Sequence, residues 1–101
     1  MDEHQFQFEW DEAKAAANLR KHGVSFELAS SIFGDPRILT LADTMHSDSE
    51  ERWFSIGLAS NGVPMSIAYL WTEAGAGFIK IRLITARRAT ASEIRYYTEN
   101  Q

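Results

Sequence analysis

The 101-residue sequence contains no cysteine and only two prolines. The lack of cysteine excludes a disulfide framework, a thiolate nucleophile and a cysteine-ligated zinc site. No apolar run approaches the roughly 20 residues that a membrane-spanning helix needs, and the acidic start at Met1 to His4 lacks the basic-then-apolar pattern of a signal peptide. A chain of this length supports one core. We therefore expect a single soluble, cytoplasmic domain over residues 1–101.

Positive charge is scarce overall but concentrated in one segment. The net charge is -4, yet five of the ten basic residues lie between Lys80 and Arg95, where Glu93 is the only acid. A local cationic patch of this kind attracts a polyanion. Residues 1–50 hold ten acids against four basic residues, so this half suits a basic protein partner.

The first 36 residues predict a strand followed by two helices. Apolar and polar residues alternate over positions 5–10, as in a half-buried strand. Asp11 is expected to cap a helix over 12–22 whose last turn is basic, and Gly23 is the expected stop signal. Ser25 is expected to cap a second helix that ends at the Gly-Asp-Pro of 34–36. The two helices should form a hairpin.

From residue 37 the hydrophobic period changes to two, which predicts four strands, over 38–41, 53–59, 65–72 and 78–85. Asn61-Gly62 predicts a two-residue type I′ hairpin turn, which needs positive φ at both positions. Thr90 and Glu93 have the spacing of a capping box that opens a final helix. The order βααββββα predicts an α+β fold with an antiparallel sheet, an N-terminal helical hairpin and a C-terminal helix.

Four blocks of the sequence resemble the BrnT family of toxins. Residues 8–26 contain W-D-E-x-K, N-x-x-K-H-G and S-F, and residues 33–36 read F-G-D-P. E-R-W and I-G follow within 51–57, and I-T-A-R-R-A-T with Glu93 lies within 84–93. Four blocks in order over nearly the whole chain are more specific than a single motif. One departure is Ala91 and Ser92, where the family often has basic residues, so we expect weaker RNA binding or a less potent toxin.

The resemblance implies a RelE-like fold and a ribonuclease that arrests translation. It also implies a BrnA-type antitoxin, encoded alongside, that neutralises the toxin. Operator DNA would then be contacted only through the antitoxin. The sequence contains no cofactor motif, so we expect no cofactor.

RNA can be cleaved without a metal when its own 2′-hydroxyl attacks the adjacent phosphate. His22 is the natural proton carrier for such a reaction, because imidazole titrates near neutral pH. Arg52 and Arg87 occupy matching family positions near strand ends, and a guanidinium grips two phosphate oxygens at once. We expect these two arginines to converge on one phosphate. Further RNA-binding residues are expected at Lys21, Lys80, Arg82 and Arg88.

Each of these residues also has a structural interpretation. His22 in the last turn of a helix is favoured by the helix dipole alone. The Arg87–Arg88 pair follows the last predicted strand and would also fit a solvated strand end, where only one of the two faces the site if the strand continues. Glu93 is favoured as the capping partner of Thr90 over a general base.

A loop with crowded acids invites a metal-site interpretation, but its spacing is neither tetrahedral nor that of an EF-hand, so no metal is expected. Its candidate ligands are Asp43, His46, Asp48 and Glu50. The tryptophans at 10, 53 and 71 are favoured as core or partner contacts over base stacking.

A second function remains open at this stage. The acidic net charge, together with Ala91 and Ser92, fits a non-catalytic module that acts as partner or co-repressor of a DNA-binding antitoxin.

Overall fold

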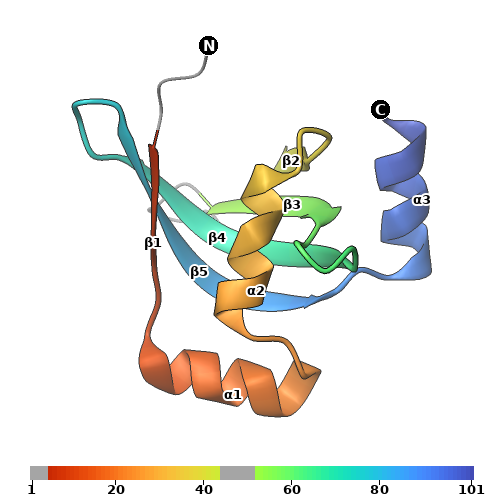
Figure 1. Cartoon of the computed structure of the whole chain (residues 1–101), viewed down its shortest axis with the longest axis horizontal. Coiled ribbons are helices and arrows are strands. Elements are labelled where there is room, and N and C mark those ends of the chain that lie inside the picture. Colours follow the sequence, from red (N-terminus) through yellow and green to blue (C-terminus); the bar gives the residue numbers. More distant parts are fainter. Residues whose placement is uncertain (1–4, 44–51) are drawn as a thin grey trace.

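The chain folds into a five-stranded mixed sheet with three α-helices and one short 3-10 helix, an α+β architecture (Figure 1). The computed structural model describes residues 5–43 and 52–101. The elements are β1 (Gln5–Glu9), α1 (Glu12–His22), α2 (Phe26–Ser30), η1 (Ser31–Gly34), β2 (Leu39–Ala42), β3 (Arg52–Leu58), β4 (Pro64–Glu73), β5 (Phe78–Arg88) and α3 (Ala91–Glu99).

The strands are ordered β1-β5-β4-β3-β2 across the sheet. Strands β2 to β5 pair with their neighbours in antiparallel fashion, but β1 pairs with β5 in parallel. The expectation of a purely antiparallel sheet is therefore wrong. The expectation fails because a hairpin makes adjacent strands antiparallel only when they follow each other in the chain. Strands β1 and β5 are far apart in the sequence, so no hairpin sets their relative direction.

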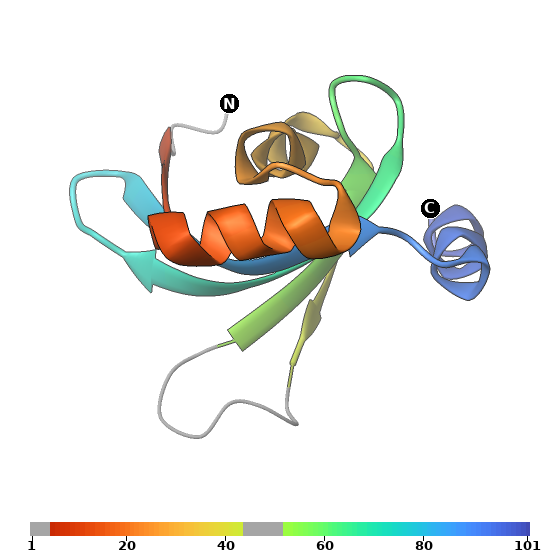
Figure 2. The same ribbon diagram turned by 90° about the horizontal axis from the view of Figure 1, so that it is seen from below.

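Helix α1 begins and ends as the sequence predicts, and it lies alongside β5 (Figure 2). The side chains of Asp11 and Ser25 each accept a 3.1 Å bond from the backbone N–H three residues on, so both helix starts are confirmed. Gly23 ends α1 with φ 69°, a left-handed conformation that glycine adopts without strain.

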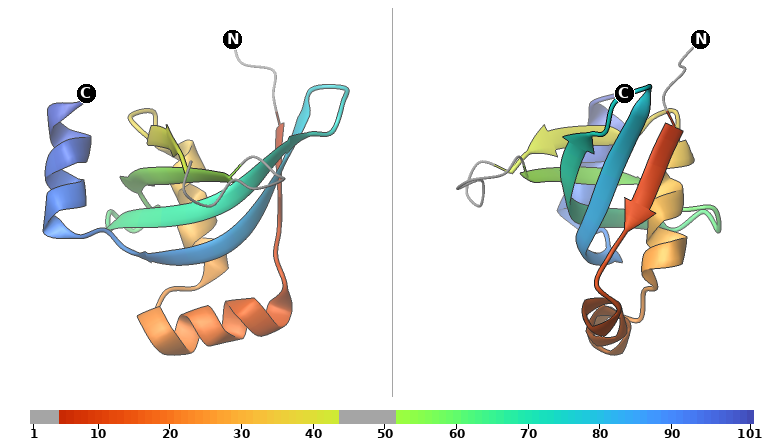
Figure 3. Two further views of the ribbon diagram at one scale, coloured as in Figure 1. Left: turned by 180° about the vertical axis from the view of Figure 1, so that it is seen from behind. Right: turned by 90° about the vertical axis from the view of Figure 1, so that its left-hand side faces the viewer.

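Helix α3 lies beyond the end of β5, at the opposite end of the sheet from β1 (Figure 3). The predicted capping box between Thr90 and Glu93 is present. The hydroxyl of Tyr97 donates a 2.6 Å bond to Asp35, and burial together with this bond raises the pKa of Tyr97 to about 12. This contact ties α3 to the turn before β2.

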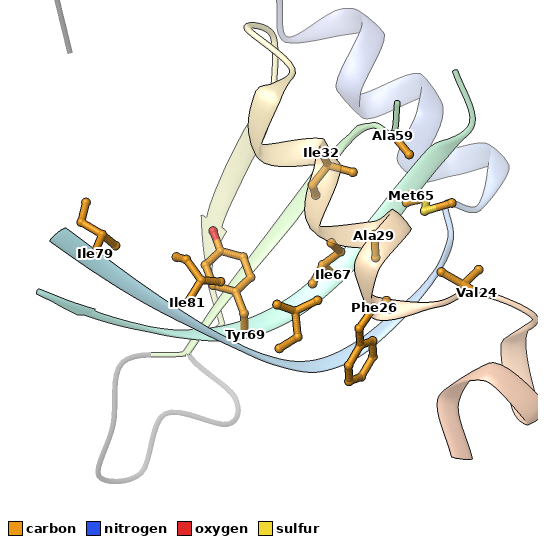
Figure 4. Packing of buried hydrophobic residues seen from close by; sticks show 12 residues of the cluster. Val24, Phe26, Ala29, Ile32, Ala59, Met65, Ile67, Tyr69, Ile79 and Ile81 are labelled. Carbon is orange, nitrogen blue, oxygen red and sulfur yellow. The ribbon is translucent and has the colours of Figure 1, made fainter. Parts of the chain in front are cut away.

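Apolar side chains from α2 and η1 cover one face of the sheet, which we call the helix-covered face, and together they form the core (Figure 4). The tryptophans at 10, 53 and 71 are half-buried and pack against this core, as expected. None of the described helices is long and apolar enough to cross a membrane. The central contacts come from Phe26, Ala29, Ile32, Ile67, Tyr69 and Ile81.

A β-bulge in β5 shifts the alternation of its side chains by one residue, so that residues after the bulge face the opposite side of the sheet from the one that a regular strand would give them. Leu83 lies opposite Tyr69, but Thr85 lies opposite Ala68, so Ile84 is an extra residue in β5. A regular strand would put Thr85 on the same face as Leu83, whereas the bulge puts it on the other face. Strand β5 also continues three residues past its expected end, to Arg88.

The turn between β3 and β4 also differs from the expected type I′ hairpin. Gly62 has φ 84°, whereas Asn61 has no positive φ. The turn is closed by the N–H of Gly62, which donates a 2.8 Å bond to the carbonyl of Ala59. Three-residue hairpin loops combine a type I turn with one left-handed glycine in this way.

Candidate active site

Two of the predicted RNA-binding side chains and one predicted catalytic side chain share the sheet face that α2 does not cover, which we call the open face. Lys80 and Arg82 lie opposite Thr72 and Leu70 of β4, and Arg87 lies opposite Ser66. In a regular strand Arg87 would point to the other face from Lys80 and Arg82, because side chains alternate. The bulge at Ile84 is therefore what places all three cations on one surface.

Arg52 also lies on the open face, but at a distance from Arg87. Arg52 pairs with Leu70 and hence lies in line with Arg82, whereas Ile56 is the β3 residue in line with Ser66 and Arg87. Strand geometry puts Arg52 and Arg87 about 13 Å apart along the strands and about 10 Å apart across them. The register therefore sets the backbones of these two arginines well apart, and their convergence on one phosphate stays a prediction. Arg52 lies 3.4 Å from the carboxylate of Asp43.

Arg87 is held by the carboxylate of Glu93. Its two terminal nitrogens donate bonds of 2.8 and 2.9 Å to the two carboxylate oxygens, and one of them also reaches the carbonyl of Arg88 at 3.2 Å. Ser66 donates a further 2.8 Å bond to Glu93. The bond from Arg87 is the main cause that lowers the pKa of Glu93 to about 2, and the same bond raises the pKa of Arg87. A carboxylate with such a low pKa is a poor base near neutral pH.

The other predicted cations have different surroundings. Arg82 forms an exposed 3.2 Å ion pair with Glu9 of β1, a type of contact that contributes little to stability. Arg88 is exposed and pairs with Met65, a residue of the core, so it belongs to the opposite face from Arg87. Lys80 is exposed on the open face. Of the adjacent pair, Arg87 is the one on the open face.

His22 is positioned by the packing of α1 against β5. Strand β1 ends at Glu9, opposite Arg82, so beyond this point no strand of the described residues pairs with β5 on that side. The buried side chain of Asn18 fills the gap, because it bonds to the carbonyl and the N–H of Ala86 at 2.8 and 3.1 Å. It also bonds to the carbonyl of Val24 at 3.1 Å. Asn18 thereby fixes the C-terminal half of α1 on the sheet.

An open pocket of about 300 Å³ lies between α1 and the bulge of β5. The half-buried His22 lines it together with Lys21. Lys14 also lines the pocket and was not among the predicted site residues. Its sequence signal is the seven-residue spacing from Lys21, which puts both on one side of a helix. The remaining walls include Ala17, Ile84 and Thr85.

The candidate metal loop lies mostly outside the described residues. His46, Asp48 and Glu50 belong to the segment 44–51, and only Asp43 of this group can be placed. Asp43 contacts Arg52.

Two comparisons identify relatives of this chain, while no curated protein matches it. Residues 10–93 match the family described as the ribonuclease toxin, BrnT, of type II toxin-antitoxin systems. Among solved structures, the 1.1 Å crystal structure of the Brucella abortus ribonuclease toxin, BrnT, is similar in fold. It has a TM-score of 0.55 at 20% identity, and the match covers 85% of this chain and 99% of that chain. Since the family match spans most of the sequence, this chain belongs to the BrnT family of ribonuclease toxins of type II toxin-antitoxin systems.

Proposed function

We propose that this chain is an endoribonuclease that cleaves RNA without a metal ion and so arrests translation. Membership of a type II toxin family implies an RNA substrate and an antitoxin partner. The observation that carries the proposal is the adjacency of two features. The bulge of β5 aligns Lys80, Arg82 and Arg87 on the open face, and the same bulge forms a wall of the pocket that holds His22.

In the proposed reaction the 2′-oxygen of a nucleotide attacks its own 3′-phosphate. A bond forms between the 2′-oxygen and phosphorus, and the bond from phosphorus to the 5′-oxygen of the next nucleotide breaks. The 2′-oxygen loses a proton and the leaving 5′-oxygen gains one. His22 carries one of these protons, because it lines the pocket and an imidazole can serve as either acid or base.

Arg87 would stabilise the extra negative charge on the phosphorane. A guanidinium has five N–H groups, and the bonds to Glu93 and the Arg88 carbonyl use three of them. The remaining two suffice for a bidentate grip on a phosphate. Glu93 then acts as a positioning residue that fixes the direction of the fork.

Arg52 would contact the same phosphate as Arg87 if its side chain spans the separation that the register sets, and otherwise a different phosphate of the same strand. Lys80, Arg82 and Arg88 would add non-specific attraction for the RNA backbone. We propose Lys21 as a phosphate-binding residue beside His22.

Incubation of the purified protein with single-stranded RNA in excess chelator tests the proposal. We expect cleavage by the wild type, and a loss of about 100-fold or more with His22→Ala, in line with the usual size of general acid–base catalysis. RNA that stays intact, while a metal-independent control ribonuclease cuts it, would refute the proposed activity.

The partner proposed for this toxin is a BrnA-type antitoxin, which would contact operator DNA on behalf of the complex, and the proposed classification of the fold is RelE-like. Induced expression with and without the neighbouring open reading frame tests the neutralisation.

The pairing of Arg87 with Glu93 favours one alternative, a non-catalytic partner of a DNA-binding antitoxin, because it partly neutralises the phosphate-binding charge. If Arg87→Ala abolishes growth inhibition but leaves antitoxin binding intact, that alternative fails.

A further inference from the structure

We infer that the pocket between α1 and β5 is a phosphate-binding site for the RNA strand and that Lys14 is a further phosphate-binding residue within it. This inference rests on the proposed ribonuclease function. The proposed function uses residues from the C-terminal end of α1 and from the open face. The inference adds Lys14, which lies near the start of α1, to this site.

The positions of the cations carry the inference. Lys14 and Lys21 are seven residues apart on α1, so their Cα atoms are about 10 Å apart along one side of the helix. Both line the pocket together with His22. Ala17 lies between the two lysines, and its short side chain leaves the space between them open. The two ammonium groups can therefore approach a single anion from opposite ends of the pocket.

There is little negative charge around the pocket to oppose the binding of an anion. None of the residues that line the pocket is acidic, and neither lysine forms an ion pair with another residue of the described chain. The C-terminal end of α1 contributes about half a negative charge from the helix dipole, which disfavours an anion. Two lysines outweigh this partial charge, so the net field in the pocket attracts a phosphate.

The pocket is also continuous with the open face. Thr85 lines the pocket and lies opposite Ala68, which places it on the same face as Arg87 two residues further along β5. A strand that leaves the pocket past Thr85 therefore meets Arg87 next. This path distinguishes a phosphodiester in a chain from a free phosphate ion, since only the former uses both places.

Binding of a 2′-O-methyl RNA oligonucleotide, measured by fluorescence anisotropy over a range of salt concentrations, tests the inference. The 2′-O-methyl groups prevent cleavage, so the result does not depend on catalysis. Loss of one phosphate contact lowers the salt slope for a single strand by about 0.7. We expect this decrease and weaker binding for Lys14→Ala, and a slope near that of the wild type for Lys14→Arg.

Arg20→Ala is the matched control, because Arg20 is an exposed cation of the same helix that does not line the pocket. Its slope should equal that of the wild type. Equal slopes for Lys14→Ala and the wild type would overturn the inference even if the protein cleaves RNA. If RNA stays intact in the cleavage assay while the salt slope of binding still depends on Lys14, the proposed ribonuclease activity is refuted but the phosphate site is supported.

Inorganic phosphate provides the second arm. The NMR signals of the Thr85 amide and the His22 imidazole should shift when the oligonucleotide is added. Inorganic phosphate at the same concentration should leave both signals unchanged. Equal shifts with both ligands would show a site for the free ion and would overturn the assignment to RNA.

Discussion

The guanidinium of Arg87 and the carboxylate of Glu93 form two parallel hydrogen bonds, of 2.8 and 2.9 Å. The same carboxylate accepts the N–H of Thr90 at 2.9 Å and thereby completes the capping box of α3. One residue therefore both starts the last helix and fixes the direction of an arginine on the open face. Such bidentate, charge-assisted pairs are among the stronger hydrogen bonds in proteins.

Replacement of Glu93 by glutamine should remove a pH-dependent part of the stability. The pKa of Glu93 is about 2 in the folded protein, below its ordinary value near 4.5. A lowered pKa means that the carboxylate stabilises the fold above pH 4.5 and that this contribution is lost as the pH falls towards 2. Because Arg87 is 36% exposed, we discount the effect for solvent screening to roughly 1–2 kcal/mol.

Urea unfolding of the wild type and of Glu93→Gln between pH 2 and pH 7 measures this contribution. The wild type should be the more stable at pH 7, and the difference should vanish near pH 2. Glutamine can also serve in a capping box, so the helix start should survive the change. A difference that is constant over this range would show that the ion pair does not stabilise the fold.

Arg87→Ala should lower the rate of RNA cleavage by about 100- to 1,000-fold, the usual cost of removing one donor that stabilises a developing charge. Arg95→Ala is the matched control, since Arg95 is an exposed arginine of α3 that has no place in the proposed site. Its cleavage rate should change by less than about threefold. Single-turnover cleavage assays measure both rates.

Glu93→Gln separates catalysis from folding in this experiment. Like Arg87→Ala, it breaks the ion pair, but it leaves the guanidinium positively charged and without a neighbouring carboxylate. We expect Glu93→Gln to bind RNA at least as tightly as the wild type. If both variants lose activity to the same extent, Arg87 acts through the structure of α3 and not on the phosphate.

Asn18→Ala should destabilise the fold by about 2–4 kcal/mol. The change leaves the carbonyl and N–H of Ala86 and the carbonyl of Val24 buried without their side-chain partner. Asn61→Ala is the control, because Asn61 is exposed and its side chain accepts a single bond, from the N–H of Val63. Denaturant unfolding measures the two costs, and similar small costs would contradict the anchoring role of Asn18.

Gly57→Ala should destabilise the fold by about 1–3 kcal/mol. A Cβ atom at Gly57 would lie 3.2 Å from the Cβ of Ile32, which is closer than ordinary van der Waals contact. At Gly34 an added Cβ would meet no atom within 4 Å, so Gly34→Ala should be nearly neutral. Thermal unfolding of the pair compares them. An equal midpoint for both variants would show that η1 shifts freely away from β3.

The local elements could be predicted from the sequence because their signals are local. Asp11, Ser25 and the Thr90–Glu93 box all cap helices through bonds that span three residues. The periods of two and 3.6 likewise depend on neighbouring residues only. These signals predicted α1, α3 and the strands of the sheet, whereas the expected second helix is divided into α2 and the 3-10 helix η1.

The arrangement of the site could not be predicted, because it depends on contacts between distant residues. Asn18 bonds to Ala86, 68 positions away, and a polar residue in a helix gives no sign of such a partner. The bulge at Ile84 also has no local signal, since Ile84 and Thr85 are both β-branched residues that suit a regular strand. The bulge changed the face of Arg87, and the register separated Arg87 from Arg52.

The central claim is that this chain cleaves RNA through the substrate's own 2′-hydroxyl without a metal ion. The most direct test is mass spectrometry of the ends of RNA fragments produced by the purified protein in excess chelator. The proposed reaction predicts one product with a 2′,3′-cyclic phosphate, or the 3′-phosphate formed from it, and the other with a 5′-hydroxyl. Fragments with 5′-phosphate and 3′-hydroxyl ends, or RNA that remains intact, would contradict it.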